Sequence, residues 1–576
     1  MSILLLYGSE TGTAQDIAES LRRESEMRHV PARAIEMDDL EMESLQNERV
    51  VVFVVSTTGQ GEMPPNMRKS WKFLLRKSLT AEYFQNVNMS VVGLGDSTYQ
   101  KFNFAGKKLY RRLLQLGVKM MTDLCLADDQ HEIGIDGALI PWKKRLWDTV
   151  YSLSLFPEMT KLLDLEVTIE PKYVIEDVDL RKLDEKVDMC RDDQQFAPLR
   201  VANNTRVTSE DHYQDTRLVR FIFEEADRQV HRFNSGDVLM VKPYNPKETV
   251  HIAIEALGYS DEMLDKPVRI VKFSSFVKPP PYYLLGNITT LRICLERYFD
   301  LQQIPRRSFF EMLCYYSQVP VEKERLAELA SPEGLDDLLD YANRCRRTTA
   351  ETLRDFHATA KLLKPHHLFE IFSVIRPRAF SIASAPHLNY VELLVAKVEY
   401  FSRMSEKRRG LCSTFIARLQ PNDEVFCKIR PGTFKFPSSE QPVVCVGPGT
   451  GVAPFRSLFF DRSQKLKVPQ RTSLLFFGCR GQHKDFYFNK EWPQLEGVEV
   501  ITAFSRDSEK KVYVQHKMAE NASTIKRLLD QGAHIYIAGS SGDMPKAVLG
   551  VLSQIKSEEW TKKAEENGII QFETWT

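Results

Sequence analysis

The chain has 576 residues, with 78 Lys or Arg against 78 Asp or Glu, so its formal net charge at pH 7 is zero. Hydrophobic residues make up 43% of the chain and Gly and Pro number 27 and 28, which excludes a disordered, collagen-like or low-complexity protein. The balanced charge removes the simplest electrostatic argument for binding nucleic acid. At about 150 residues per domain, the length predicts three or four globular domains.

The nine cysteines are dispersed and form no CxxC pair, so the sequence predicts neither a disulfide framework nor a zinc site. No apolar run approaches the roughly 20 residues that span a bilayer, and the run at 3–6 is too short for a signal peptide. We therefore expect a cytoplasmic protein without a bound metal, a nucleic-acid partner or a membrane anchor.

Short apolar runs alternate with helix-compatible segments in residues 1–150, which predicts a parallel α/β sheet covered by helices. The strands are expected at 3–6, 50–55 and 89–94, and each ends in a loop rich in Gly, Ser and Thr. Because ligands bind beyond the carboxyl ends of parallel strands, the three loops should share one crevice. Residues 151–199 have a weaker pattern and many charges, and we interpret them as a linker.

From residue 200 the pattern becomes that of a β-barrel or sandwich. Strands are expected at 217–223, 238–241, 379–382 and 391–398. Helical spacing interrupts this pattern, with helices expected at 290–298, 321–341 and 350–363. We therefore predict a β domain over 200–435 that contains a helical insertion at about 260–368.

The last part of the chain, 436–576, returns to α/β alternation. Its buried strands are expected at 443–446, 473–477, 498–503 and 534–538. Each of these apolar runs is followed by small or polar residues, as in a sheet whose strand ends carry a ligand site. The sequence thus predicts two α/β domains on either side of one β domain.

The loop Ser9–Ala14 follows the first strand and precedes a helix expected to begin near Gln15. Its hydroxyls, its glycine and the helix N-terminus offer hydrogen-bond donors and a positive dipole end to a phosphate. Taken alone, the same residues equally well form a capped strand-to-helix turn. The loops at 56–61 and 94–103 favour the phosphate site, because they stand where a ring system would lie if the first loop held its phosphate.

Together the three loops resemble the flavodoxin-like FMN domain. The resemblance implies that the first loop holds the phosphate, that the other two flank the isoalloxazine with Tyr99 flat against it, and that Asp129 closes the site. Related reductases often carry a second aromatic residue in place of Thr58, so one face of the FMN is expected to be more open here. The implied FMN residues are Ser9, Glu10, Thr11, Gly12, Thr13, Ala14, Ser56, Thr57, Thr58, Gly59, Leu94, Gly95, Asp96, Ser97, Thr98, Tyr99, Gln100, Lys101, Phe102, Asn103 and Asp129.

Two short segments of the β domain resemble the R-x-[YF]-S and G-x-x-[ST] motifs of the ferredoxin-NADP reductase family. Arg378 can pair with the FAD pyrophosphate, Phe380 can stack on the ring, and Ser381 can bond near the nitrogen that receives hydride. Gly410 permits close backbone approach before a helix expected at 414–419. The implied FAD residues are Arg378, Ala379, Phe380, Ser381, Gly410, Leu411, Cys412 and Ser413. Arg346 or Arg347 is a further candidate, although a solvated basic face explains that pair nearly as well.

The glycine-rich loop 447–456 departs from G-x-G-x-x-G spacing but matches the nicotinamide loop of the same family. A 2'-phosphate needs a guanidinium or ammonium group and a hydroxyl, whereas the ribose of NAD is usually met by a carboxylate. The cluster at 505–515 therefore favours NADPH, although without the resemblance it would be a charged surface turn. The candidates are Thr450, Ser505, Arg506, Lys511, Val512, Tyr513, Val514 and Gln515.

An aromatic residue near a C-terminus is normally a packing anchor. In diflavin reductases, however, a near-terminal aromatic covers the FAD until nicotinamide displaces it, and Trp575 occupies that position. Glu573 matches an acidic residue near the hydride-transfer site, so Ser381, Glu573 and Trp575 are the candidate catalytic residues. Relatives often carry cysteine and aspartate in place of Ala538 and Ala547, so hydride transfer is expected to be slower or differently assisted.

The predicted order is a flavodoxin-like α/β FMN domain, an FAD-binding β-barrel with a helical insertion, and an α/β ferredoxin-NADP reductase-like NADPH domain. This order resembles the cytochrome P450 reductase family of diflavin reductases, and within it the cytosolic NADPH-dependent diflavin oxidoreductases. The resemblance implies that electrons pass from NADPH to FAD to FMN and then singly to the [2Fe-2S] protein anamorsin in iron-sulfur cluster assembly. Methionine synthase or a haem protein as acceptor, and a non-catalytic flavin-containing scaffold, remain alternatives.

Overall fold

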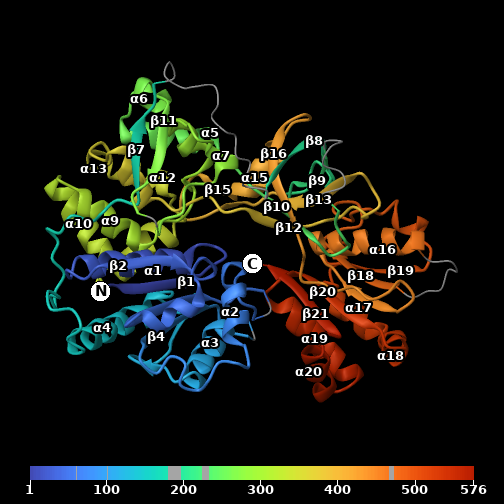
Figure 1. Cartoon of the computed structure of the whole chain (residues 1–576). Helices are drawn as coiled ribbons and strands as arrows, with labels where there is room; N and C mark the ends of the chain where they lie inside the picture. Colours follow the sequence, from blue (N-terminus) through green and yellow to red (C-terminus); the bar gives the residue numbers. More distant parts are fainter. Residues whose placement is uncertain are drawn as a thin grey trace. The chain divides into compact units, whose positions relative to one another are not determined.

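The computed structural model describes residues 1–59, 61–99, 101–179, 196–223, 232–274, 276–465 and 473–575. By their contacts these residues form two compact units, and each unit is built from separate stretches of the chain (Figure 1). Unit 1 comprises Met1–Asp193, Tyr244–Arg376 and Phe401–Lys407. Unit 2 comprises Gln194–Pro243, Pro377–Tyr400 and Arg408–Thr576.

Unit 1 begins with a parallel sheet ordered β2-β1-β3-β4, with β5 and β6 both paired to β4. Helices α1 and α4 pack on one face of this sheet, and α2 and α3 pack on the other. From β1 the chain crosses to β2 on one side, and it then returns to β3 on the other side of β1. The winding therefore reverses between β1 and β3, whose carboxyl ends frame a crevice. The elements are β1 (Ile3–Gly8), α1 (Thr13–Glu26), β2 (Ala32–Glu36), β3 (Val50–Ser56), α2 (Arg68–Leu74), β4 (Asn88–Gly95), α3 (Phe104–Gln115), β5 (Lys119–Met120), β6 (Cys125–Asp128) and α4 (Asp136–Ser152).

Part of the segment interpreted as a linker forms a strand. Residues Tyr173–Asp177 form β7, which pairs with β11 (Val268–Lys272) in an antiparallel ladder. The alternating pattern in these residues is too weak to predict this pair. Residues 180–195 of the expected linker lie outside the described residues.

The helical insertion packs around a core rich in phenylalanine, including Phe299, Phe310 and Phe369. Its helices are α5 (Lys247–Leu257), α6 (Asp261–Asp265), α7 (Tyr282–Leu285), α8 (Leu291–Arg297), α9 (Arg307–Tyr316), α10 (Pro320–Ala330), α11 (Leu335–Leu338), α12 (Thr349–Asp355), α13 (His357–Ala360) and α14 (Leu368–Ile371). The prediction of a helical insertion is confirmed.

Two expected helices are each divided. The helix expected at 321–341 stops at Ala330, where a Cβ on Gly334 would lie 1.9 Å from the carbonyl oxygen of Glu328, so the turn tolerates only glycine. The helix expected at 350–363 breaks at Phe356, whose φ of −108° and ψ of 45° leave the helical region. Apolar spacing continued across both breaks and therefore concealed them.

Unit 2 contains an antiparallel sheet ordered β12-β10-β16-β8-β9-β13. A bridge between Ile382 and Leu393 joins the two outer strands, so the sheet closes on itself as a barrel. Helix α15 (Leu411–Arg418) begins earlier than the expected 414–419, because Gly410 has extended backbone and serves as its N-cap. The strands are β8 (Ala197–Arg206), β9 (Thr216–Ile222), β10 (Val238–Val241), β12 (Arg378–Ser381), β13 (Tyr390–Ala396) and β16 (Glu424–Arg430).

The rest of unit 2 is a parallel sheet ordered β19-β18-β17-β20-β21. This is the order of the doubly wound dinucleotide-binding folds, in which the direction of winding reverses between the first and fourth strands, here β17 and β20. Strand β21 was not predicted and extends to Trp575. The elements are β17 (Val443–Val446), α16 (Ala453–Lys465), β18 (Ser473–Cys479), β19 (Val498–Phe504), α17 (Val514–Glu520), α18 (Ala522–Asp530), β20 (His534–Ser540), α19 (Asp543–Ile555), α20 (Glu558–Glu566) and β21 (Ile570–Trp575).

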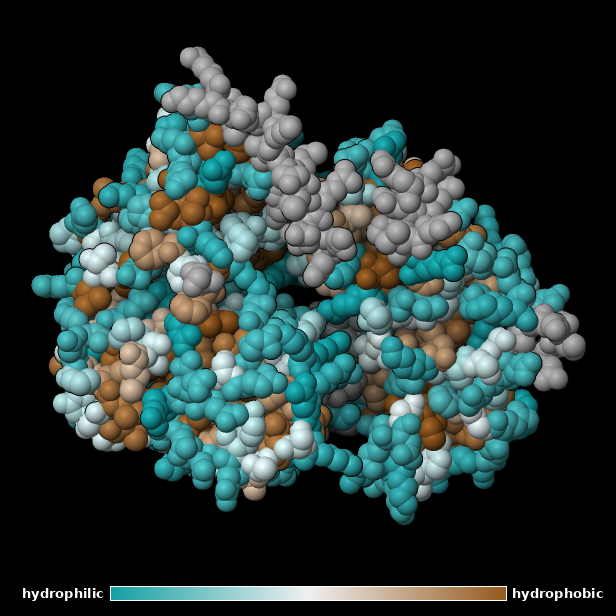
Figure 2. All heavy atoms as spheres, viewed as in Figure 1, coloured by the Kyte–Doolittle hydropathy of each residue, from teal (hydrophilic) through white to brown (hydrophobic). Residues whose placement is uncertain are grey.

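Among the described residues, no helix combines the length and the apolar character that crossing a bilayer requires. Figure 2 shows hydrophilic residues over much of the drawn surface, with hydrophobic residues between them. Large exposed apolar side chains include Leu162, Leu165 and Val321.

A buried ion cluster ties the barrel to the parallel sheet within unit 2. Arg456 in α16 lies 2.8 Å from a carboxylate oxygen of Glu392 in β13 and 2.7 Å from one of Glu491. Arg220 donates two hydrogen bonds, of 3.0 and 2.8 Å, to the other oxygen of Glu392. The Glu392 side chain is only 2% exposed, so both arginines are needed to compensate its negative charge.

We expect Arg456→Met to lower the free energy of unfolding by about 3 kcal/mol, because removing one partner leaves a buried carboxylate poorly compensated. This decrease is at the low end of the range for breaking a buried ion pair, because Arg220 still pairs with Glu392. Thermal and urea unfolding of the full chain would measure it. Arg325→Met is the matched control, because Arg325 pairs only with exposed carboxylates and its loss should cost less than about 1 kcal/mol. Equal small losses in both variants would contradict this role.

Candidate functional site

The first candidate site lies at the carboxyl end of β1, where the chain turns into α1. Ser9 is buried, its amide donates to Asn66 Oδ1 at 2.9 Å, and its hydroxyl accepts from the amide of Gly12 at 3.0 Å. Gly12 has φ 95°, a conformation that a side chain would strain, and the helix starts directly after it. Because the first amides of a helix have no acceptor within it, Thr13 and Ala14 present N–H groups there. The loop is therefore built to hold an anion.

Backbone bonds hold the other two loops of this sheet beside each other. The amide of Thr57 donates to the carbonyl of Leu94 at 3.0 Å, and its hydroxyl accepts from the amide of Ala105 at 3.2 Å. The amide of Asp129 donates to the carbonyl of Gly95 at 2.9 Å. The structure thus brings together the loops predicted to flank a ring, at the end of the sheet that carries the anion loop.

Asn103 fixes the backbone of the third loop. It is fully buried with φ 56°, and its Nδ2 donates to the carbonyl of Ala127 at 3.0 Å. A Cβ on Gly95 would lie 2.9 Å from the Asn103 amide, so this close approach requires glycine. Tyr99, expected against the ring, is half-buried, and Gln100 lies outside the described residues.

Charged groups around Asp129 shift its pKa. Partial burial of the carboxyl group, and then repulsion from Asp96, raise the pKa of Asp129, while Arg306 and Arg346 act in the opposite direction. Arg346, expected near the FAD, has φ 54° and lies in unit 1, where its charge acts on Asp129.

The second candidate site lies on the barrel of unit 2. In β12, Phe380 pairs with Leu239 and Ser381 with Val238, and Arg378 is exposed at the start of the strand. A Cβ on Gly410 would lie 2.8 Å from Ser413 Oγ and 2.9 Å from Val398 Cβ, so glycine allows the backbone to approach both residues closely. The first turn of α15 therefore presents its amides next to this strand of the barrel, as anion binding needs.

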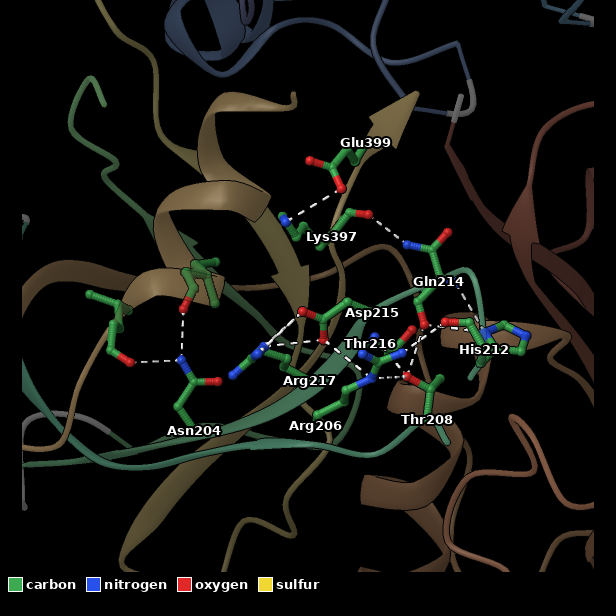
Figure 3. Close-up of polar contacts among 12 residues, drawn as sticks. Asn204, Arg206, Thr208, His212, Gln214, Asp215, Thr216, Arg217, Lys397 and Glu399 are labelled. Carbon is green, nitrogen blue, oxygen red and sulfur yellow. Dashed lines mark hydrogen bonds and ion pairs between the residues drawn. The ribbon is translucent and has the colours of Figure 1, made fainter. Parts of the chain in front are cut away.

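A polar network on the barrel supports α15 (Figure 3). Asn204 Nδ2 donates to the carbonyls of Ile416 and Leu419, both at 2.9 Å, and so holds the end of the helix. Gln214 donates to the carbonyl of Lys397 at 2.6 Å. Val398, which follows Lys397, accepts a hydrogen bond from the amide of Gly410 at 2.9 Å, and its own amide donates to Ser413 Oγ at 3.0 Å. Both ends of the helix are therefore fixed to the barrel.

The third candidate site lies where the winding reverses, between β17 and β20. A Cβ on Gly451 would lie 2.3 Å from the carbonyl oxygen of Ala538, so the loop after β17 touches the end of β20 directly. Gly449 has φ 58°, and a Cβ there would meet no heavy atom within 4 Å, which leaves space beside the loop. Thr450, half-buried, lies between these two glycines.

The cluster at 505–515 lies at the carboxyl end of β19. The amides of Ser505 and Arg506 donate to the carbonyls of Cys479, the last residue of β18, and of Arg480, at 3.0 and 2.8 Å. Arg506, Lys511 and Tyr513 are exposed, so a guanidinium, an ammonium and a hydroxyl are available to a phosphate. Val514 is buried as the first residue of α17, so it can reach a ligand only through its backbone. The remaining members of the predicted set, Val512 and Gln515, are half-buried.

Ser381 and Glu573 meet in unit 2. Ser381 Oγ donates to Glu573 Oε1 at 2.5 Å, whereas Glu573 Oε2 is buried without a hydrogen-bond partner among the described residues. The neighbour of Glu573 on β20 is Ala538, which offers no side-chain donor. Burial raises the pKa of Glu573, and the bond from Ser381 acts in the opposite direction. This orphaned oxygen fits a site that a bound flavin or nicotinamide completes. Trp575, 39% exposed, ends the same strand.

Comparison with known proteins agrees with this geometry. Residues 5–142 match the flavodoxin family, residues 190–415 the FAD binding domain, and residues 445–549 the oxidoreductase NAD-binding domain. The chain is 39% identical to NADPH-dependent diflavin oxidoreductase 1 of Danio rerio, over 100% of this chain and 99% of that protein. The proteins of the same name from Xenopus laevis and Arabidopsis thaliana are 38% and 36% identical, each over 100% of this chain and 99% of the relative.

The three matched domains define a diflavin reductase, which binds FMN, FAD and NADPH and passes electrons from NADPH through FAD and FMN. Similarity of this extent shows that the chain belongs to the NADPH-dependent diflavin oxidoreductase 1 family. The predicted family, fold class and cofactors are thereby confirmed.

Sequence reasoning missed residues that reach these sites from elsewhere in the chain. Asn66, which holds the amide of Ser9, comes from a short 3-10 turn before α2. Arg306 comes from the helical insertion and donates to Thr13, and Arg376 comes from the segment after α14 and donates to Gln15. No local pattern marks such residues, because their role depends on a tertiary contact.

We expect the free energy of unfolding of the wild type to fall as the pH rises above 4.5, which is the usual pKa of a glutamate. The fall should continue up to the higher pKa of buried Glu573. In that range the folded chain binds a proton that the unfolded chain has lost, so deprotonation favours unfolding. Glu573→Gln should remove this part of the decline, as measured by thermal unfolding from pH 4.5 to 8. Glu559→Gln, at an exposed glutamate, is the control. Superimposable pH profiles for wild type and Glu573→Gln would show that burial does not perturb this carboxyl group.

Proposed function

We propose that this reductase delivers single electrons to a [2Fe-2S] protein of the anamorsin type, in cytosolic iron-sulfur cluster assembly. The observation that carries the proposal is similarity over the whole chain to proteins named NADPH-dependent diflavin oxidoreductase 1, together with the resemblance of the flavin loops to that branch of the family. A cytoplasmic location is part of the proposal. Each of the eight described cysteines is free, as is usual in a reducing compartment.

The charge of the FMN end supports a small protein acceptor. The loops around the ring site carry Asp96, Asp128, Asp129 and Glu132, and the last two are exposed. Charged surfaces of this kind steer transient partners and raise their rate of association. An acceptor with a basic face around its cluster fits this surface.

We assign the ends of the electron path to particular residues of this chain. When bound, the nicotinamide supplies electrons in pairs and the flavins pass them on one at a time. Thr450 would contact the nicotinamide, and the hydroxyl and cations at Ser505, Arg506 and Lys511 would hold the 2'-phosphate.

In the barrel, Arg378 and the N-terminus of α15 would hold the FAD pyrophosphate. Ser381 and Glu573 would order the site of hydride transfer, and Trp575 would cover the ring. At the other end of the path, Tyr99 would shield the FMN. The boundaries 1–150, 200–435 and 436–576 remain our proposal for the three cofactor domains.

The proposal predicts that the NADPH-reduced enzyme transfers one electron at a time to a [2Fe-2S] anamorsin-type protein, faster than to a haem protein or to methionine synthase. Because the FMN loops are acidic, the rate should fall as ionic strength rises. Stopped-flow absorbance of cluster reduction measures it. Faster reduction of a haem acceptor or of methionine synthase would favour that acceptor instead. Failure of NADPH to bleach the flavins under anaerobic conditions would identify a non-catalytic scaffold.

A further inference from the structure

An arginine of the helical insertion reaches the anion loop of the flavodoxin domain. Arg306, immediately before α9, donates from Nη2 to the hydroxyl of Thr13 at 2.9 Å. Its other terminal nitrogen is 4.0 Å from a carboxylate oxygen of Asp16, at the limit of an ion pair. The closest contact of this guanidinium to the loop is therefore a hydroxyl, and that hydroxyl belongs to a residue expected to hold phosphate.

A second arginine approaches the same loop. Arg376 donates from its guanidinium to the side-chain oxygen of Gln15. Its Nε would lie 3.5 Å from a Cβ built on Gly12, and its Nη2 would lie 3.7 Å from it. Both guanidinium groups thus lie beside the turn between β1 and α1.

The loop lacks a cation of its own. The segment Gly8–Asp16 contains Glu10 and Asp16 and no Lys or Arg. A phosphate monoester carries a charge of roughly −1.5 to −2 at pH 7, so two carboxylates in this segment oppose its binding. Backbone amides and a helix dipole offset only part of that repulsion. Arginine is the side chain best suited to supply the missing positive charge.

The contact with Thr13 also leaves its proton available. A hydroxyl has one proton and two lone pairs. Because Thr13 Oγ1 accepts from Arg306, its proton remains free to donate to a phosphate oxygen. Arg306 therefore orients the hydroxyl and brings positive charge to the loop at the same time.

Other contacts already hold the insertion against α1. Ser308 donates to both oxygens of Asp16, at 2.8 and 2.9 Å, and Arg22 pairs with buried Glu370 at 3.2 Å. Ser20 donates to a carboxylate of the insertion at 3.4 Å. Docking of the insertion thus has bonds that do not involve the two arginines.

We propose that Arg306 of the helical insertion and Arg376, which follows α14, complete the phosphate subsite of the FMN. The inference rests on FMN binding by the flavodoxin domain and adds that part of the affinity comes from a residue 293 positions further along the chain. Riboflavin has the same ring without the phosphate, so it separates this contribution from binding of the ring.

The test is a titration of full-length protein depleted of FMN, with FMN and with riboflavin, followed by quenching of flavin fluorescence. Arg306→Gln and Arg376→Gln should each weaken FMN binding about tenfold, as expected for the loss of a charge-assisted bond, and leave riboflavin affinity unchanged. The loss should shrink at high salt. FAD content, measured on the same samples, reports that the variants are folded.

Ser308→Ala is the matched control, because it removes a docking bond at the same interface without removing a cation. Equal weakening of FMN and riboflavin in the arginine variants, or an equal effect of Ser308→Ala on FMN, would assign the arginines to docking alone and overturn the inference. A wild type that takes up no FMN would instead overturn the assignment of the cofactor, and the inference with it. Wild-type FMN binding that both arginine variants retain in full would overturn only the subsite.

Discussion

Parallel strands that lead off to opposite sides of a sheet leave a crevice at their carboxyl ends, and the chemistry of this chain depends on that constraint. The chain uses it twice, between β1 and β3 in unit 1 and between β17 and β20 in unit 2. Only glycine allows the backbones to meet so closely, as Gly451 does against Ala538. Each crevice is thus a consequence of strand order, and the side chains around it decide which cofactor it takes.

The barrel of unit 2 serves a different purpose. Its strands do not create a crevice, so the site depends on a helix, α15, fixed at both ends by Asn204 and by the backbone near Lys397. The ion cluster around Glu392 then joins the barrel to the second sheet, which places Ser381 and Glu573 within one hydrogen bond. In unit 2, noncovalent contacts between residues distant in the chain thus assemble these sites.

Much of this organisation could be predicted from the sequence. Continuous apolar runs at 50–55 and 443–446 predict buried parallel strands. The hydroxyl-rich and glycine-rich loops after them indicate the cofactor class through their resemblance to the flavodoxin-like and ferredoxin-NADP reductase families. Sequence pattern failed where a contact between distant segments decides the outcome. The division of the helix at Phe356 is hidden by continuous apolar spacing. The approach of Arg306 to Thr13 has no local signature, since it joins residues 293 positions apart.

The central claim is that two flavins at two separate sites act in series. The most direct test is anaerobic addition of NADPH to the full chain after selective removal of FMN, with flavin absorbance and reduction of the protein acceptor followed together. The account predicts that the FAD bleaches while the acceptor stays oxidised, and that added FMN restores acceptor reduction. Reduction of the acceptor at the full rate without FMN would contradict it.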